Sequence, residues 1–515
     1  MRLQSPATSL RKPLAFVVVA LALLSAFPIA NSIAAGDDRL LALILVAGFG
    51  SWVIVLVLGN WRHGVLLLFV WIVFEDLIRK SLGNSMMVYA AKDVMAVAVY
   101  VSFLLSQRRA GEPRLKNPLR VPLLAFVAWV ILSTFNPAID NFAVPILGMR
   151  MTLFYVPLLY IGYAFFRNDA ELRRFLMVIA GVAGIVALMG VLQSFLGLNF
   201  LNPADAPNLR LYLTRYSPEA GLAVPRPNAT FVDSGRFSIY MFISVFVGLG
   251  LIGYLYSLSK LENRRMIRWA LTFWAATVVG LILSGGRAAI LFTLLSIPMC
   301  LLALNWNRRH ARAQGRRFPI LQVAVVAALF LFLVVGIMPE RFVAVYSFLS
   351  DTIDPTSEFS EFESRPASYW RDTVRAFSLG GWLGHGTGSA SLGRQYLSEF
   401  LSSEQVFRYR TQVEGGYASV LWEWGVVGLI LWIWWTAALM VVLFNRVRRL
   451  RGTRFFWLAV SVSICLFMLL FPIFYMGMPV YQNYVTQAML WFAAGLVLRL
   501  PEAARTPEAP DRRVA

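Results

Sequence analysis

The sequence predicts an all-α polytopic membrane protein with about 12 to 14 transmembrane helices and one large, partly helical loop on one face of the membrane. The composition supports this class, because 58% of the 515 residues are hydrophobic, only 14% are charged, and the mean hydropathy is +0.66. Apolar runs also recur at the length that crosses a hydrocarbon layer about 30 Å thick. A β-barrel would show short segments of alternating polarity, and lipid permits no third spanning structure because unpaired backbone groups are too costly there.

The apolar runs divide the chain into four parts. Residues 1–337 and 417–500 hold the expected spans, residues 338–416 form the large loop, and residues 501–515 form a tail whose composition is typical of disorder. The individual spans are expected near residues 14–30, 39–58, 64–78, 87–106, 119–135, 146–166, 174–196, 237–257, 267–284, 287–304, 320–337, 417–443, 455–475 and 485–498.

Three of these spans leave alternatives open. The first apolar run resembles a cleaved signal peptide with a weak site at Ala34–Ala35, but a retained span fits better because many spans follow. Glu75 and Asp76 interrupt the third span, and the pair of spans around Gly285–Gly286 can form a hairpin.

The distribution of charge predicts the orientation. If the N-terminus is cytoplasmic, every strongly basic connection falls on the cytoplasmic side, and the outer side receives residues 197–236 and 338–416. Both termini are therefore expected in the cytoplasm. The formal net charge of +20 follows from these short basic loops and does not indicate nucleic-acid binding.

Cysteine and histidine are too few and too scattered for redox or metal chemistry. Cys300 and Cys465 both lie inside apolar runs, where a buried small hydrophobe is the expected role. The three histidines, His63, His310 and His385, have no cysteine or carboxylate at ligand spacing. We expect no protein-bound metal and no cofactor.

Arginines near the outer face are the first candidate site residues. Arg287 follows Ser284–Gly286 between two apolar runs, where a buried charge costs at least about 2.5 to 3.5 kcal/mol. It therefore either anchors at the interface or meets an anion, and we favour an anion because glycines let a ligand approach the backbone. Arg226 and Arg236 lie in the preceding outer loop. Each alone is more often a solvated charge, but together they predict a diphosphate site, since forked guanidinium donors match phosphate oxygens.

The large loop contains an expected helix. Ser364 is the expected N-cap, the apolar residues Trp370, Val374 and Phe377 recur at helical spacing, and Gly380–Gly381 can stop the helix. Arg365 lies near its start, and Arg371 and Arg375 share one face. This helix either lies on the membrane with its arginines toward headgroups or presents them to a substrate.

Glycines and carboxylates flank the next span. The run Gly384-His385-Gly386-Thr387-Gly388 is a tight turn, because it lacks the ending and the βαβ context of a nucleotide loop. Glu414 and Glu423 would lie roughly 14 Å apart on one helix, too far for a carboxylate pair. Glu414 is the better candidate general base, and Glu423 more naturally braces a neighbouring helix.

The order of these short motifs resembles the O-antigen ligase and O-antigen polymerase superfamily of the bacterial inner membrane. The resemblance covers roughly residues 220–440. It rests on the segments Arg226–Phe231, Ser284–Ala289, Arg365–Trp370, Gly384–Gly388 and Glu414–Gly428.

The resemblance implies an enzyme that takes an oligosaccharide from undecaprenyl diphosphate at the periplasmic face and transfers it, with inversion and without metal, to a sugar hydroxyl. Arg226 and Arg287 match the arginines that hold the diphosphate in such proteins, and Arg365 and Arg371 are expected to assist them. The implied partners are a polyprenyl-diphosphate-linked oligosaccharide and the bilayer, together with a chain-length regulator and export proteins.

One position departs from the family pattern. Ligases of the family usually have a histidine followed by asparagine where this chain has Glu414–Gly415. A carboxylate can accept a proton as an imidazole does, so the departure favours a polymerase of an exopolysaccharide or capsule over a lipopolysaccharide ligase. His385 is the alternative base. Two other classes stay open: a flippase for an anionic glycolipid, and a noncatalytic component of a polysaccharide export complex.

Overall fold

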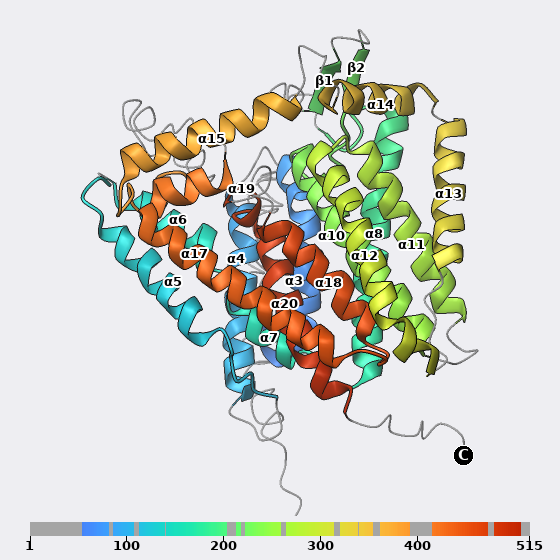
Figure 1. The fold of residues 1–515 in the computed structure, drawn as a ribbon, viewed down its shortest axis with the longest axis horizontal. Helices are drawn as coiled ribbons and strands as arrows, with labels where there is room; N and C mark the ends of the chain where they lie inside the picture. Colours follow the sequence, from blue (N-terminus) through green and yellow to red (C-terminus); the bar gives the residue numbers. More distant parts are fainter. Residues whose placement is uncertain are drawn as a thin grey trace, which may run out of the picture. The chain divides into compact units, whose positions relative to one another are not determined.

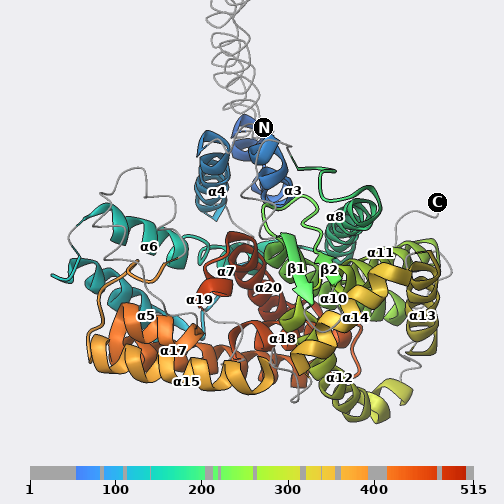
Figure 2. The same cartoon turned by 90° about the horizontal axis from the view of Figure 1, so that it is seen from above.

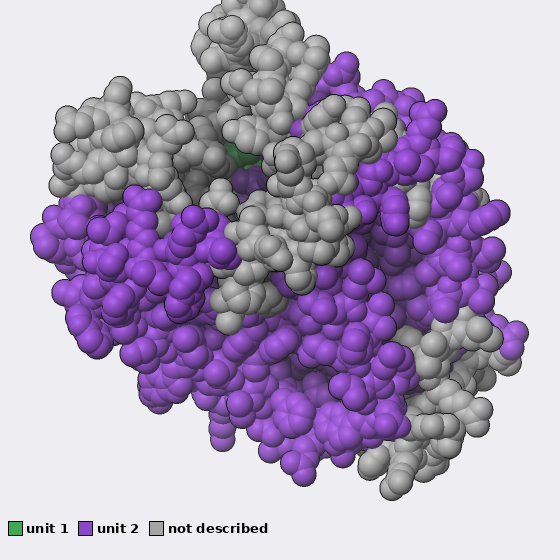
Figure 3. Space-filling model, turned by 45° about the horizontal axis from the view of Figure 1, so that its top comes forward, with its two compact units in different colours: residues 1–112 green, residues 113–515 purple. Residues whose placement is uncertain are grey.

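The computed structural model describes residues 54–81, 86–107, 113–139, 141–202, 213–217, 222–258, 264–313, 320–337, 339–353, 361–391, 415–471 and 478–505. The chain forms two compact units, residues 1–112 and 113–515 (Figure 3). The predicted all-α polytopic class is confirmed, and the described strands form a single two-stranded hairpin. Seven described helices are long and apolar enough to cross a membrane.

Every expected span from 64–78 onward coincides with described helix. In the first unit the helices are α3 (Trp61–Ser81) and α4 (Met86–Gln107). In the second unit they are α5 (Arg120–Leu132), η1 (Ser133–Phe135), α6 (Ala143–Leu153), α7 (Leu158–Ala164), α8 (Asp169–Leu196), α10 (Ser234–Ser257), α11 (Arg264–Leu283), α12 (Arg287–Ala313), α13 (Ile320–Ile337), α14 (Pro339–Ile353), α15 (Glu361–Gly380), α17 (Gly416–Arg449), α18 (Phe456–Leu470), α19 (Met478–Tyr481) and α20 (Tyr484–Ala503). The expected span at 14–30 and most of that at 39–58 lie outside the described residues, so the total of 12 to 14 stays a prediction.

In the first unit, α3 and α4 pair through buried charges. Lys92 Nζ lies 2.8 Å from Glu75 Oε1, and Arg79 lies 3.1 Å from Asp76 on the same helix. Tyr89 adds a ring face to Lys92, with Nζ 3.2 Å from the ring centroid. Unpaired, any of these buried charges would be strongly destabilising, and the pairing explains how an otherwise apolar helix contains Glu75 and Asp76.

In the second unit, α10 is the central helix. It packs against α8, α11, α18 and α20, and most of its apolar window is buried (Figure 1). Small residues allow large rings to insert between these helices. A Cβ on Gly190 of α8 would lie only 2.5 Å from Cζ of Phe237, and a Cβ on Gly248 would lie 2.9 Å from the Trp274 ring. Close helix packing at glycine is the usual mode of association in lipid.

Two helices of the interval 338–416 lie across the end of this bundle. Helix α15 runs along the start of α17, as both views show (Figures 1 and 2), and α14 packs over the strands β1 (Thr214–Ser217) and β2 (Leu222–Pro225). The strands are antiparallel, with Thr214 opposite Pro225. Val224, Ala344, Val345 and the partly buried Ile282 form the apolar contact between hairpin, α14 and α11.

Helix α17 is broken at Gly425, whose φ of +64° and ψ of −165° are not helical. The backbone groups that the break frees are bonded to the loop after α15 instead of to one another. The four exchanged bonds are Val426 N to Gly381 O (3.2 Å), Val427 N to Trp382 O (3.4 Å), His385 N to Trp422 O (2.8 Å) and Gly386 N to Glu423 O (2.9 Å). A non-helical turn is tolerated inside a membrane protein when its polar groups are satisfied in this way.

Candidate functional site

The loop before α10 is held by a buried amide network. Gln193 of α8 accepts hydrogen bonds from the backbone N–H of Asn228 (2.9 Å) and Ala229 (2.8 Å), and its amide donates to Asn228 Oδ1 (2.8 Å). Asn202 exchanges two further bonds with Asn228, of 3.0 and 3.1 Å. Gln193 and Asn228 are fully buried. A satisfied buried network specifies one loop conformation, so the segment that follows Arg226 is rigidly placed.

Arg226 lies on the turn that precedes Arg287. Its Nε donates to the carbonyl oxygen of Ser284 (3.1 Å), and its side chain covers Gly285, where a Cβ would lie 3.3 Å from Arg226 Cγ. Gly285 has a φ of +58°, which favours glycine. Two motifs 58 residues apart in sequence therefore form one surface.

The turn itself is built by Ser284 and Gly286. Ser284 Oγ donates to Leu281 O (2.6 Å) and accepts from Gly286 N (3.2 Å), which closes the turn between α11 and α12. A Cβ on Gly286 would lie 2.4 Å from Ser238 of α10, so only glycine allows this approach. Arg287 is the first residue of α12 and is half-buried.

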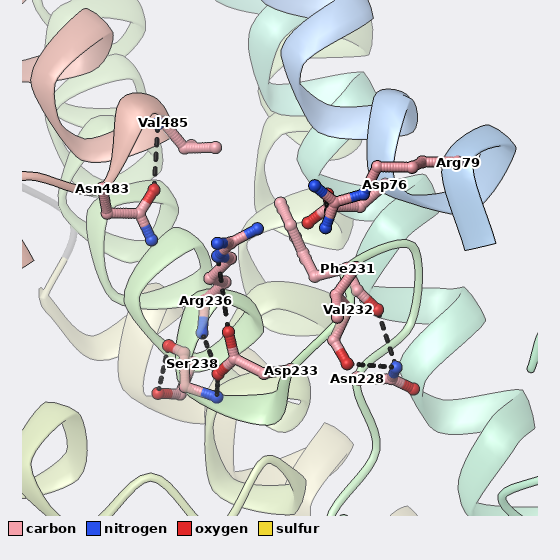
Figure 4. A network of polar contacts seen from close by, with 11 residues as sticks. Asp76, Arg79, Asn228, Phe231, Val232, Asp233, Arg236, Ser238, Asn483 and Val485 are labelled. Carbon is pink, nitrogen blue, oxygen red and sulfur yellow. Dashed lines mark hydrogen bonds and ion pairs between the residues drawn. The ribbon is translucent and has the colours of Figure 1, made fainter. Parts of the chain in front are cut away.

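Arg236 adds a third guanidinium from the first turn of α10. Asp233 caps this helix by accepting from the backbone N–H of Gly235 (2.6 Å) and Arg236 (3.1 Å), and its other oxygen lies 3.4 Å from Arg236 Nε (Figure 4). The Arg236 guanidinium also lies 5.4 Å from the ring centroid of Tyr484, which begins α20. The side chain is 17% exposed.

Helix α15 has three distinct faces. Tyr369 and Ala376 are buried, and Ala376 packs on α17 against Ala418 and Leu421. A second face is apolar but exposed, with Trp370 70% and Phe377 56% exposed. Arg371 and Arg375 form the third, exposed face, on the side away from α17. The predicted N-cap at Ser364 is wrong, because the helix already includes Glu361, whereas its end at Gly380 is confirmed.

Arg365 and Arg371 therefore occupy different sides of α15. Arg365 precedes the buried Tyr369 by four residues, so its backbone position is on the side that faces α17. Tyr369 in turn adjoins Gly415, where a Cβ would lie 3.2 Å from Tyr369 Cδ1. Glu414 lies outside the described residues. Its neighbour Gly415 is the N-cap of α17, so the chain at that point passes beside the middle of α15.

His385 lies in the loop that fills the break in α17. Its ring stacks on Trp422 with the centroids 4.2 Å apart, and Nδ1 lies 3.3 Å from the Trp422 carbonyl oxygen. This loop follows the C-terminal end of α15, whereas β2 and α14 lie toward the other end, about 30 Å away for a helix of this length (Figure 1). The structure thus brings Arg226 to the turn before Arg287 but does not bring His385 to them.

Glu423 braces the same loop, and not a neighbouring helix as the sequence predicted. The carboxylate is fully buried and accepts from the backbone N–H of Gly388 (3.2 Å, to Oε2) and Ala390 (3.2 Å, to Oε1). Thr387, directly before Gly388, donates to Val130 O (2.7 Å) and accepts from Trp424 Nε1 (3.1 Å). The loop is thereby tied to α5 and α17.

Sequence reasoning missed Gln193, Asn202 and Tyr484. Of these three residues, only Gln193 could have been identified from the sequence. A single amide inside a long apolar run is expected to face the protein interior and to have a hydrogen-bond partner. Over the part of the chain that the structure describes, no group of three or more His, Cys, Asp and Glu side chains is arranged to hold a metal ion.

A comparison with protein families matched residues 270–433 to the family model described as O-antigen ligase. The match begins in α11 and ends in α17, so it includes the Ser284–Arg287 turn, α15 and the His385 loop, while Arg226 and Arg236 lie before it. A comparison with curated proteins found no match. The resemblance inferred from the motifs is confirmed.

Proposed function

We propose that this chain, a relative of the O-antigen ligases and polymerases through residues 270–433, is a membrane glycosyltransferase whose diphosphate site includes Arg226 and Arg287. The family match supports glycosyl transfer from lipid-linked oligosaccharides in general. The finer proposal is inverting, metal-independent transfer from undecaprenyl diphosphate to a sugar hydroxyl at the periplasmic face of the inner membrane, as a polysaccharide polymerase.

The contact between Arg226 and the turn before Arg287 is the observation that carries this proposal. Arg226 is held at Ser284 O and Gly285, and Arg236 is held by Asp233 in the same loop. Guanidinium groups fixed in advance stabilise the charge that develops on a departing diphosphate without reorganising during the reaction. The buried Gln193–Asn228 network supplies that rigidity.

In the proposed reaction the acceptor hydroxyl oxygen bonds to the anomeric carbon while the bond from that carbon to the diphosphate oxygen breaks. The lipid diphosphate leaves with the bonding electron pair, and the anomeric configuration inverts. The hydroxyl proton passes to the carboxylate of Glu414. The sugar gains positive charge and the leaving oxygen gains negative charge, so one base and fixed arginines suffice.

The arginine site is tested by Arg226→Ala and Arg287→Ala in a strain that lacks the native copy. Each change should lower polymer formation by about 100-fold or more, because it removes transition-state stabilisation, while membrane insertion and the thermal unfolding midpoint stay unchanged. Arg287→Lys should retain part of the activity, since it keeps the charge but loses the fork. Polymer and lipid-linked intermediates are measured together.

Arg264→Ala is the matched control. Arg264 is exposed at the opposite end of α11, so this change removes one guanidinium without touching the proposed site. Normal polymer from a stably inserted Arg287→Ala protein would refute the assigned role, as would an equal loss in Arg264→Ala.

The base is tested by comparing Glu414→Gln with His385→Phe. We expect Glu414→Gln to abolish transfer and His385→Phe to preserve it, because phenylalanine can keep the stacking on Trp422 but cannot take up a proton. The reverse result would assign the base to His385. If neither substitution lowers polymer formation, the result would favour the alternative that the chain is a noncatalytic component of an export complex.

The transporter alternative has one observation in its favour, the break in α17, because broken helices are typical of transporters. The freed backbone groups are, however, bonded to the loop at residues 381–386 and not directed at a cavity. The two functions differ in the intermediate that a deletion strain accumulates. Single repeat units on lipid at the periplasmic side indicate a polymerase, and units held at the cytoplasmic side indicate a flippase.

A further inference from the structure

A second site lies at the end of the bundle away from α14 and α15. The second unit contains a groove of about 800 Å³ that is lined by residues of α12, α17 and α18. These three helices are labelled in Figure 1. Its walls are mainly apolar and include Leu302, Trp306, Leu443, Phe444, Ile464 and Phe467. The groove is larger than the packing gaps of a protein interior and is within the range of ligand pockets.

The groove ends at two arginines. Arg448 and Arg451 both line it, and no acidic residue is among its described lining residues. Arg454, three residues after Arg451, differs from these two arginines because its guanidinium is paired with a carboxylate, that of Asp169, at 2.5 Å. Two cations beside an apolar wall without a carboxylate form a site for an anion that carries hydrocarbon.

Arg451 is held in place before any ligand arrives. Its guanidinium lies 3.4 Å from the ring centroid of Trp306, and that ring stacks on Phe444 with the centroids 5.6 Å apart. The adjoining residue Gly452 donates its N–H to Asn307 Oδ1 (2.9 Å), which ties the loop to α12. Arg451 Nε is buried and has no hydrogen-bond partner among the described residues.

A polar group inside the groove fits the same ligand. Ser463 of α18 lines the groove, and its Oγ is buried without a partner in the described structure. A serine in a membrane helix normally bonds to the carbonyl one turn before it, so this free hydroxyl is available to an acceptor such as an ester carbonyl.

We propose that this groove binds an anionic phospholipid. The phosphate lies between Arg448 and Arg451, and an acyl chain lies along α12 and α18. Basic pockets between transmembrane helices on the cytoplasmic side are suited to such headgroups, and the charge alternation of the sequence places this end in the cytoplasm. The site is separate from the proposed diphosphate site, so it does not depend on the proposed function.

The test uses delipidated full-length protein in detergent, titrated with phosphatidylglycerol or with phosphatidylcholine of the same acyl chains, and read by native mass spectrometry. Phosphatidylglycerol should bind with one lipid per chain. Arg451→Gln should weaken it about tenfold, because a charge-assisted contact is lost, and Leu302→Trp should weaken it by a similar factor by filling the groove.

Two matched controls accompany these variants. Arg449→Gln removes the same charge from an exposed residue of α17 that does not line the groove, and Leu301→Trp adds the same ring one residue away on α12. Both should bind as the native protein does. All four variants should keep the lipid-free unfolding midpoint, which separates loss of the site from loss of the fold.

Four results would overturn the proposal. These are equal binding of phosphatidylcholine, equal weakening by Arg449→Gln and Arg451→Gln, unchanged binding in Leu302→Trp, and a groove occupied by a second copy of the chain or by a polyprenyl phosphate. The last two occupants are recognised by a dimer mass and by the mass of the retained lipid.

Discussion

At the residue scale, Gln193 and Asn228 show how a buried polar pair places the loop that contains Arg226 of the proposed diphosphate site. Gln193 is in a transmembrane helix and Asn228 is in the loop after β2. The hydrogen bonds between them therefore fix the loop to helix α8. Because both side chains are fully buried, water cannot replace a lost partner. The position of Arg226 therefore depends on the Gln193 amide, which binds the backbone two residues further along the loop.

We predict that Gln193→Leu destabilises the protein and lowers its activity. The change leaves the N–H groups of Asn228 and Ala229 buried without an acceptor, at a cost of about 1 to 3 kcal/mol for each group. The thermal unfolding midpoint in detergent should fall. Ser194→Ala is the control, since among the described residues the Ser194 hydroxyl bonds within its own helix, to Gly190 O. Equal midpoints for the two variants would contradict the role of the network.

At the scale of single elements, the break in α17 and the loop after α15 form one structure. The loop's glycines allow close backbone contact, and at Gly425 a Cβ would lie 2.3 Å from the carbonyl oxygen of Trp382. Glu423 then holds the far end of the loop. The loop that follows α15 is thus attached to α17 at the break and at Glu423.

We predict that Gly425→Ala displaces this loop. Alanine is strained at a φ of +64° and collides with backbone that cannot move aside, so a loss of more than about 2 kcal/mol is expected. Limited proteolysis should then cut residues 381–391 faster. Gly336→Ala in α13 is the control, because no described side chain and no other described segment lies within 4 Å of its added Cβ. Unchanged proteolysis in Gly425→Ala would show that the break is not required.

The three faces of α15 lead to a prediction about its surroundings. We expect the exposed apolar face to lie in lipid at the interface, because Trp370 and Phe377 would otherwise expose a large apolar surface to water. A fluorophore attached at Val374→Cys should be quenched by nitroxide lipids, whereas the same label at Arg375→Cys, on the arginine face, should be accessible to aqueous quenchers. Aqueous quenching of both labels would contradict an interfacial position.

At the scale of the whole molecule, the alternation of basic and acidic loops predicts which ends of the second unit face the cytoplasm. Arg446, Arg448 and Arg449 form the last turn of α17, and a basic last turn also suits the helix dipole. The dipole of α17 alone would favour these basic residues whichever membrane face they occupy. The orientation is therefore tested separately, by measuring which face is accessible to a reagent.

We expect an impermeant maleimide to label Ser378→Cys but not Arg449→Cys in intact spheroplasts, in a chain whose Cys300 and Cys465 are replaced by alanine. Both positions are exposed in the structure, so accessibility differs only through the membrane. After lysis both should react, which controls for reactivity. The opposite pattern would invert the orientation and move the proposed transfer reaction to the cytoplasm.

The sequence by itself determined the all-α membrane class, the positions of the described spans and the family resemblance. These properties depend on hydropathy and charge within short windows, which act locally. Only the tertiary structure decided that Arg226 lies on the turn before Arg287, that His385 stacks on Trp422 far from both, and that α17 breaks at Gly425. Each of these depends on backbone and side-chain contacts between segments distant in sequence, and in lipid such contacts are set by the packing of whole helices, which no local pattern specifies.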